Sequence, residues 1–318
     1  MRPAYSVILF TTVTGAAYGL LAVLGCLLLL GGTPGSSSGP LLALTLALGL
    51  ASLGLLASVF HLTRPGRAWR AFSQWRTSWL SREGLAAVAV YLAALPLGAA
   101  LLRWPVDHPV VRTLGSVMAA LALLTIICTA MIYASLKPVP QWRHPTVVPA
   151  YLLLGLATGT LLLGPCFQIV ETSQPMLRWA ALGTLLGAWG AKELYWHAAR
   201  SPCPSLTSVA ATGLARFDVV RLLDAPNTES NYLLHEMGYR IARKHADKLR
   251  RVVRGTAFGL PILLVVSVHV FEGLPVWPQF ALAVLAACSA LLGTLVERWL
   301  FFAEARHTVT LYYGAVSV

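Results

Sequence analysis

Eight long apolar runs dominate this sequence of 318 residues and constrain its fold more than any other feature. They cover residues 6–30, 41–60, 84–102, 113–136, 146–170, 179–196, 255–271 and 278–296. A helix needs about 20 largely apolar residues to cross a hydrocarbon core of roughly 30 Å. A transmembrane barrel would instead alternate apolar and polar residues over about ten positions. We therefore predict an all-α, polytopic membrane protein with eight transmembrane helices, forming one integral membrane domain over residues 1–318.

The low content of charged residues agrees with a chain embedded in lipid. Charged residues make up 11% of the sequence and hydrophobic residues 57%, whereas a soluble domain carries about a quarter charged residues. The first run is too long for a cleavable signal and a second run follows closely, so we expect it to stay as a helix. The seventh run is the shortest of the eight.

The net charge of +12 predicts the orientation of the chain in the membrane. Eight spans place both termini on one side, which carries 21 of the 24 Lys and Arg residues. We call it the cation-rich side; the opposite side has only Arg103, Arg112 and Arg178. The positive-inside rule then predicts that the cation-rich side, with both termini, faces the cytoplasm. Because the cations crowd a membrane edge, nucleic-acid binding is rejected as their explanation.

The long connection at 198–254 contributes a basic amphipathic segment to the predicted cytoplasmic side. Its apolar positions are Leu234, Met237, Ile241, Leu249 and Val252, and its basic positions are Arg240, Arg243, Lys244, Lys248, Arg250 and Arg251. This spacing is typical of an amphipathic helix that leads into the seventh span. It either lies on anionic lipid headgroups or docks the acidic face of a partner protein, and both interpretations stay open.

The cysteine and histidine residues limit the redox groups that the chain can hold. The five cysteines show no C-x-x-C motif and no cluster, so we expect no iron–sulfur centre and no metal site. Among the histidines, only His61 and His197 have the similar depth that a bis-His haem requires. Histidines at span ends also simply form hydrogen bonds at the interface, and we expect no haem.

The loop between the second and third runs concentrates the reactive side chains. Arginine and tryptophan alternate along residues 61–83, with His61 closing one helix and Glu83 opening the next. Ionisable groups at the edge of the apolar zone are candidates for function. Oxidation of a hydroquinone releases two protons, and an imidazole with a carboxylate nearby can accept and relay them. Arginine can bind a quinone oxygen, and tryptophan can pack on the ring.

A simpler interpretation of the same loop is membrane anchoring. Arg and Trp side chains are common anchors at a membrane face, and Glu83 could cap the third helix after Ser81. On composition alone the anchoring interpretation is favoured over a redox site.

Five segments nevertheless resemble one known family, the DMSO-reductase membrane anchors. They are HLTRP at 61–65, WRTSWLSRE at 75–83, MIYASLK at 131–137, YLLLGLATG at 151–159 and LLDAPNTESNY at 222–232. The likeness covers nearly the whole chain. It implies a quinone-reactive anchor, free of haem and iron–sulfur clusters, that is not itself catalytic toward the substrate. The implied partners are a molybdopterin catalytic subunit and a ferredoxin-like four-cluster iron–sulfur subunit docking on the side of both termini.

The resemblance also assigns candidate residues for the quinone site. The family's catalytic histidine and its acidic partner correspond to His61 and Glu83. We add Arg64 on physical grounds, as a neighbour one helical turn from His61. Further quinone-binding candidates in the matching motifs are Trp75, Arg76 and Tyr133.

The predicted orientation selects among the members of this family. In exported DMSO reductases the quinone site and docking loop face the periplasm, whereas here the cations place them in the cytoplasm. The cytoplasm-facing relatives include quinone-linked sulfite dehydrogenases, so we expect sulfite oxidation at a bacterial inner membrane. The alternatives are the anchor of an exported reductase, a purely structural anchor and, in another class, a secondary transporter.

Overall fold

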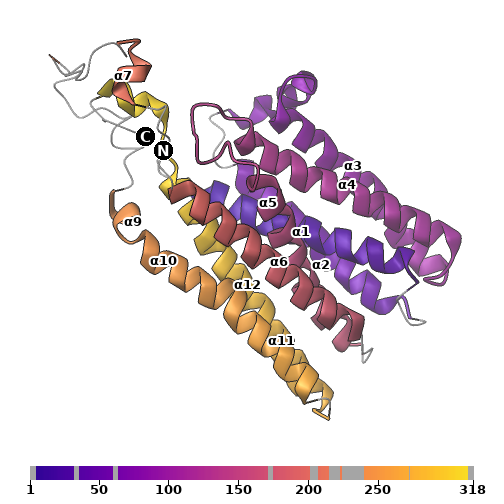
Figure 1. Cartoon of the computed structure of the whole chain (residues 1–318). Helices are drawn as coiled ribbons and strands as arrows, with labels where there is room; N and C mark the ends of the chain where they lie inside the picture. The colour runs from indigo at the N-terminus through magenta and orange to yellow at the C-terminus, as the bar shows by residue number, and fades with distance from the viewer. Residues whose placement is uncertain are drawn as a thin grey trace.

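The structure is a computed structural model that describes residues 5–31, 36–59, 64–170, 175–200, 207–214, 223, 240–271 and 273–313. Within these ranges the chain is helical and contains no β-strand. The long helices lie side by side in one bundle, as Figure 1 shows. This arrangement suits a membrane because a helix satisfies its own backbone hydrogen bonds where no water is present.

The bundle consists of long helices joined by short connections. The long helices are α1 (Tyr5–Leu29), α2 (Ser38–Val59), α3 (Trp79–Arg103), α4 (Pro109–Ala134), α5 (Val147–Gln168), α6 (Pro175–Arg200) and α12 (Val276–Glu304). A further long helix consists of three consecutive elements, α10 (Ala246–Val253), η2 (Arg254–Gly259) and α11 (Leu260–Val270). The short elements are η1 (Pro65–Gln74), α7 (Ser208–Ala211), α9 (Arg240–Lys244) and η3 (Thr308–Tyr313). The η2 segment is a single π-helical turn that joins α10 and α11 into one continuous helix.

Seven helices of the described chain are long and apolar enough to cross a membrane. They include seven of the eight predicted runs, and the prediction of an all-helical polytopic membrane protein is confirmed. The remaining run forms α6, which has 26 residues but also carries Arg178, Lys192 and Glu193. A total of eight spans therefore remains a prediction.

The seventh span is longer than its apolar run indicates. The apolar run begins at residue 255, and the sequence predicts a basic amphipathic helix that leads into it; in the structure the continuous helix begins nine residues before the run, at Ala246. The extra turns are basic, and they are accommodated because Arg250 and Arg254 form ion pairs with Glu304 and Glu193 on neighbouring helices. The periodicity of apolar residues alone does not reveal these pairs.

Helix α1 lies at the centre of the bundle and contacts α2, α4, α5 and α12. Its contact with α5 is made by glycine backbones: a Cβ atom on Gly19 would lie 1.8 Å from the carbonyl oxygen of Gly155. A Cβ on Gly159 would lie 2.2 Å from the carbonyl carbon of Gly19. Between helices in lipid there is little hydrophobic driving force, so close backbone approach through small residues supplies the packing energy.

Replacing Gly19 by alanine should therefore separate α1 from α5. We expect Gly19→Ala to destabilise the protein by about 3 kcal/mol, the upper end of the usual range for overpacking, because the clash is with backbone atoms. The measurement is the thermal unfolding midpoint in detergent. Gly15→Ala on the same helix is the matched control, since its Cβ would meet no atom within 4 Å. Equal midpoints for the two variants would contradict the packing described.

Candidate functional site

Glu83 lies inside the bundle, in the second turn of α3. The residue is 5% exposed, and the hydroxyl of Thr129 on α4 donates a hydrogen bond of 2.5 Å to its Oε1 atom. Ser78 is the N-cap of α3, and no side chain caps the helix there. The interpretation of Glu83 as a helix cap is therefore wrong, because its carboxylate is directed toward α4.

The segment that precedes α3 is short, cationic and exposed. Residues 64–77, which include η1, are all exposed, so the side chains of Arg64, Trp75 and Arg76 lie on the surface. Arg82 fastens this segment to α3, because its Nε and Nη2 atoms donate to the carbonyl oxygens of Trp75 and Arg76 at 2.9 and 2.7 Å. The result is an exposed surface of arginine and tryptophan next to a buried carboxylate.

The predicted site residues are thus distributed over two environments. Arg64, Trp75 and Arg76 lie on the exposed segment, whereas Glu83 and Tyr133 are buried in the bundle. His61 lies outside the described residues. The roles of all these residues stay predictions, and so does the absence of haem, since His197 is exposed on α6 but its possible partner is not described.

Tyr133 joins the α3–α4 side of the bundle to an aromatic cluster. It lies one helical turn after Thr129, and its ring centroid is 5.9 Å from that of Tyr151 on α5. The cluster continues to Trp142 and to the end of α12, with Tyr133 in edge contact at 5.3 Å from Trp142 and 5.6 Å from Phe301. The Trp142 indole donates to the carbonyl oxygen of Phe301 at 3.1 Å.

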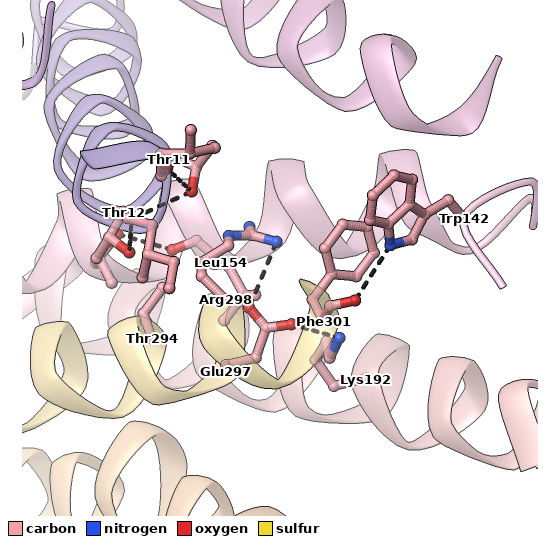
Figure 2. A network of polar contacts seen from close by, with 12 residues as sticks. Thr11, Thr12, Trp142, Leu154, Lys192, Thr294, Glu297, Arg298 and Phe301 are labelled. Carbon is pink, nitrogen blue, oxygen red and sulfur yellow. Dashed lines mark hydrogen bonds and ion pairs between the residues drawn. The ribbon is translucent and has the colours of Figure 1, made fainter. Parts of the chain in front are cut away.

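A second ionisable group, not anticipated from the sequence, lies beside this aromatic cluster. Lys192 of α6 and Glu297 of α12 form an ion pair with a separation of 2.5 Å between Nζ and Oε1. Figure 2 shows the two side chains directed toward each other, with Arg298 close by. The Nη1 atom of Arg298 is 3.4 Å from Oε2 of Glu297. We call Lys192, Glu297 and Arg298 the buried triad, because each is at most 3% exposed.

Aromatic rings cover the cations of the buried triad. The guanidinium carbon of Arg298 lies 3.4 Å from the ring centroid of Tyr151. The ammonium of Lys192 lies 4.0 Å from the ring centroid of Tyr195. Cation–π contacts of this kind gain strength when both partners are desolvated. They hold the two cations in place with a single carboxylate between them.

The buried triad is well inside its helices. Lys192 precedes the end of α6 by eight residues, and Glu297 precedes the end of α12 by seven. At a rise of about 1.5 Å per residue, each group is roughly 10–12 Å from the helix end. Ionisable residues in spanning helices are rare, face the bundle interior and mark functional paths.

Lys192 and Arg298 are counted among the water-facing cations in the prediction from sequence, and this assignment is wrong. Both are buried because each has a partner: Lys192 pairs with Glu297, and Arg298 contacts Glu297 and the Tyr151 ring. Two features of the sequence could have indicated this burial: a Lys-Glu pair at 192–193 and a Glu-Arg pair at 297–298, each next to or within a long apolar run.

A further set of ion pairs joins the end of α12 to the surface at α10. Arg250 is 7% exposed and forms ion pairs with Glu304 of α12 and with Asp247, the latter at 2.9 Å. The side chain of Asp247 is 78% exposed. The sequence pattern predicts Arg250 on the polar face and Val252 on the apolar face. The structure reverses these positions, because the Arg250 ion pairs turn it inward and leave Val252 exposed.

Known proteins agree with the resemblance that the sequence motifs indicate. Residues 1–314 match the family described as "DMSO reductase anchor subunit (DmsC)", and the chain belongs to this family. The chain is 33% identical over 342 residues to one subunit of the sulfite dehydrogenase of Allochromatium vinosum, with full coverage of both chains. It is also 27% identical over 164 residues to "Protein NrfD" of Escherichia coli K12, which covers 44% of this chain and 52% of the relative.

A double-mutant cycle will measure how strongly the ion pair joins α6 to α12. Glu297→Gln leaves Lys192 and Arg298 without their carboxylate, so we expect it to lower the unfolding free energy by about 3 kcal/mol. Lys192→Met removes one cation and leaves Glu297 beside Arg298, so its loss should be smaller. The double variant should lose clearly less than the sum, because only Arg298 then lacks its carboxylate. Thermal unfolding in detergent gives the values, with Arg70→Met on exposed η1 as the control. Additive losses would show that the pair contributes no coupling.

Proposed function

We propose that this chain is the quinone-reactive anchor of a multisubunit molybdopterin oxidoreductase. The observation that carries the proposal is the buried Glu83 carboxylate, held by Thr129 and next in sequence to Arg82, which binds an exposed arginine- and tryptophan-rich segment. In a chain that belongs to the anchor-subunit family, such a carboxylate at the membrane edge suits proton exchange with a lipid-soluble substrate.

In this proposal the residues of the site divide the work. A bound quinone or hydroquinone supplies the two-electron chemistry. His61 and Glu83 accept or deliver protons at its oxygens, and Thr129 fixes the Glu83 carboxylate through the 2.5 Å hydrogen bond. Arg64 binds one oxygen, and Trp75 with Arg76 covers the entrance. Tyr133, behind Glu83, keeps that side of the site apolar apart from one hydroxyl.

The proposed partners are those of a respiratory complex with three subunits. A ferredoxin-like four-cluster iron–sulfur subunit would dock on the cation-rich side, where residues 64–77 present exposed arginines. A molybdopterin subunit would carry out the substrate reaction. The lipid bilayer is the remaining partner, and α6 would be the eighth span, held among the others by its pair with Glu297.

The substrate that we favour for the complex is sulfite. The full-length similarity to a protein named as part of a sulfite dehydrogenase supports this choice. The positive-inside rule supports it as well, since it places the cation-rich side and both termini in the cytoplasm of a bacterial inner membrane. The second candidate is the anchor of an exported DMSO reductase, which the family description favours.

Substitution of the proton-handling residues tests the proposed site. We expect Glu83→Gln and His61→Ala to lower quinone-linked turnover of the intact complex by about 100-fold, since positioned acid–base groups contribute about 10²- to 10⁴-fold. Asp107→Asn is the control, because this carboxylate is exposed at the opposite end of the bundle. Native turnover in both site variants, with the complex still assembled, would disprove the assignment.

Cysteine labelling distinguishes the two candidate orientations. Thr212 is exposed in the long connection, and Asp107 is exposed at the opposite end of the bundle. In a cysteine-free background, we expect Thr212→Cys to react with an impermeant maleimide only after cell lysis. Asp107→Cys should react in intact cells. The reverse pattern would place the cation-rich side outside and favour the exported reductase.

A further inference from the structure

The buried triad contains an excess of positive charge that its own residues do not balance. Lys192 and Arg298 oppose a single carboxylate, Glu297, and all three are at most 3% exposed. An apolar interior strongly favours arrangements with no net charge. Glu83 is the buried carboxylate on the other side of the aromatic cluster. When Glu83 is ionised and Lys192 is protonated, the four groups together are neutral.

This balance links the protons on two distant residues. If Glu83 gains a proton, the four groups are neutral only when Lys192 has lost one. Arg298 stays protonated in proteins and repels a proton on Lys192, whereas Glu297 attracts it. Of the two cations in the triad, Lys192 is therefore the one that can release and regain a proton. The triad can hold a proton that Glu83 later receives.

A row of hydroxyl groups lies between the two ends. Thr129 contacts Glu83, and Tyr133 follows Thr129 by one turn of α4. The ring of Tyr133 stacks with that of Tyr151, and the Arg298 guanidinium also lies over the Tyr151 ring. Every member of this row lies in the half of the bundle nearest η1 and the end of α12.

Buried hydroxyls in this region lack hydrogen bonds of ordinary geometry. Among the residues that the structure describes, the hydroxyl oxygens of Tyr151 and Tyr195 have no such partner, although the Arg298 guanidinium lies against the Tyr151 ring. Buried polar atoms are nearly always paired, either with protein groups or with ordered water that bridges them. Two such hydroxyls on either side of an ion pair are suitable positions for a water-bridged proton path.

The outer end of the row reaches the aqueous surface at α10. Tyr195 lies beside Lys192, and its ring centroid is 5.8 Å from that of Phe301, three residues before Glu304 on α12. Glu304 pairs with Arg250. Arg250 in turn pairs with the exposed carboxylate of Asp247. Ionisable or hydroxyl side chains therefore run from an exposed carboxylate to the buried triad.

We propose that the buried triad is the inner station of a proton path joining Asp247 at the surface to Glu83, by way of Tyr195, Tyr151 and Tyr133. The inference rests on the proposed function. Reduction of a quinone to hydroquinone takes two electrons, from the iron–sulfur partner, and two protons. The path supplies protons to Glu83 from the cation-rich side, and oxidation of hydroquinone returns them along it.

A purely structural role for the triad predicts something different. If Lys192 and Glu297 only hold α6 to α12, the unpaired hydroxyls of Tyr151 and Tyr195 are dispensable. Removing an unpaired buried hydroxyl leaves every ion pair intact and is neutral or stabilising. The double variant Tyr151→Phe/Tyr195→Phe therefore separates transport of protons from support of the fold.

The test follows the protonation of Glu83 directly. A rapid pH jump is applied to the purified complex, depleted of quinone, and infrared absorption records the carboxyl band that is missing in Glu83→Gln. We expect this band to respond about 100-fold more slowly in Tyr151→Phe/Tyr195→Phe and in Lys192→Met, the lower limit for a positioned proton donor. Millimolar formic acid, a small proton carrier, should restore much of the rate.

The control is Tyr91→Phe, which removes a hydroxyl that bonds Ser52 between α2 and α3, away from the path. An unchanged rate in the double tyrosine variant overturns the path, whatever the Lys192 variant does. Because the measurement needs no quinone, it stays informative if Glu83→Gln retains native quinone turnover. That result would contradict the proposed function. Loss of quinone turnover in Glu83→Gln, together with an unchanged rate of Glu83 protonation in Tyr151→Phe/Tyr195→Phe, would contradict only the path.

Discussion

The backbone contact between α1 and α5 is the constraint around which the bundle is arranged. With Gly19 and Gly155 almost touching, the two helices approach closer than any side chain would permit. The same helix meets α4 through Gly25, whose Cβ would lie 2.2 Å from the carbonyl oxygen of Gly115. Helices α2 and α12 then complete the shell around α1. Van der Waals contact along these narrow interfaces replaces the hydrophobic drive that lipid removes.

The buried ionisable side chains of this apolar arrangement have polar or aromatic neighbours. Glu83 has Thr129, and Lys192 has Glu297 together with the ring of Tyr195. The Glu83–Thr129 contact joins the consecutive helices α3 and α4, and the Lys192–Glu297 pair joins α6 to the distant α12, so these polar contacts also hold helices together. This explains how α6, the least apolar of the long helices, is accommodated beside α5 and α12.

Much of the fold could be predicted because long apolar runs determine helices directly. The family could also be predicted, because motifs such as HLTRP are short, continuous segments that can be recognised in the sequence alone. The buried triad could not, because Lys192 and Arg298 look like surface cations until the partners of each are known. The inward position of Arg250 could not be predicted for the same reason, because it depends on Glu304, 54 residues away. The periodicity of apolar residues describes one helix at a time, whereas the burial of a charged side chain depends on its partner on another helix.

The distribution of ionisable side chains along the helix axes has an electrical consequence. In the described helices, Glu83 and the buried triad occupy the half nearest η1, while the other half carries Arg103, Arg112, Arg178 and His269 only toward its helix ends. The layer between is apolar, with scattered hydroxyls. The buried ionisable groups of the described helices therefore lie near one membrane surface, and an apolar layer separates them from the other surface. If electrons and protons both enter from the cation-rich side, the reaction moves no net charge across the bilayer, and its rate is insensitive to the membrane potential.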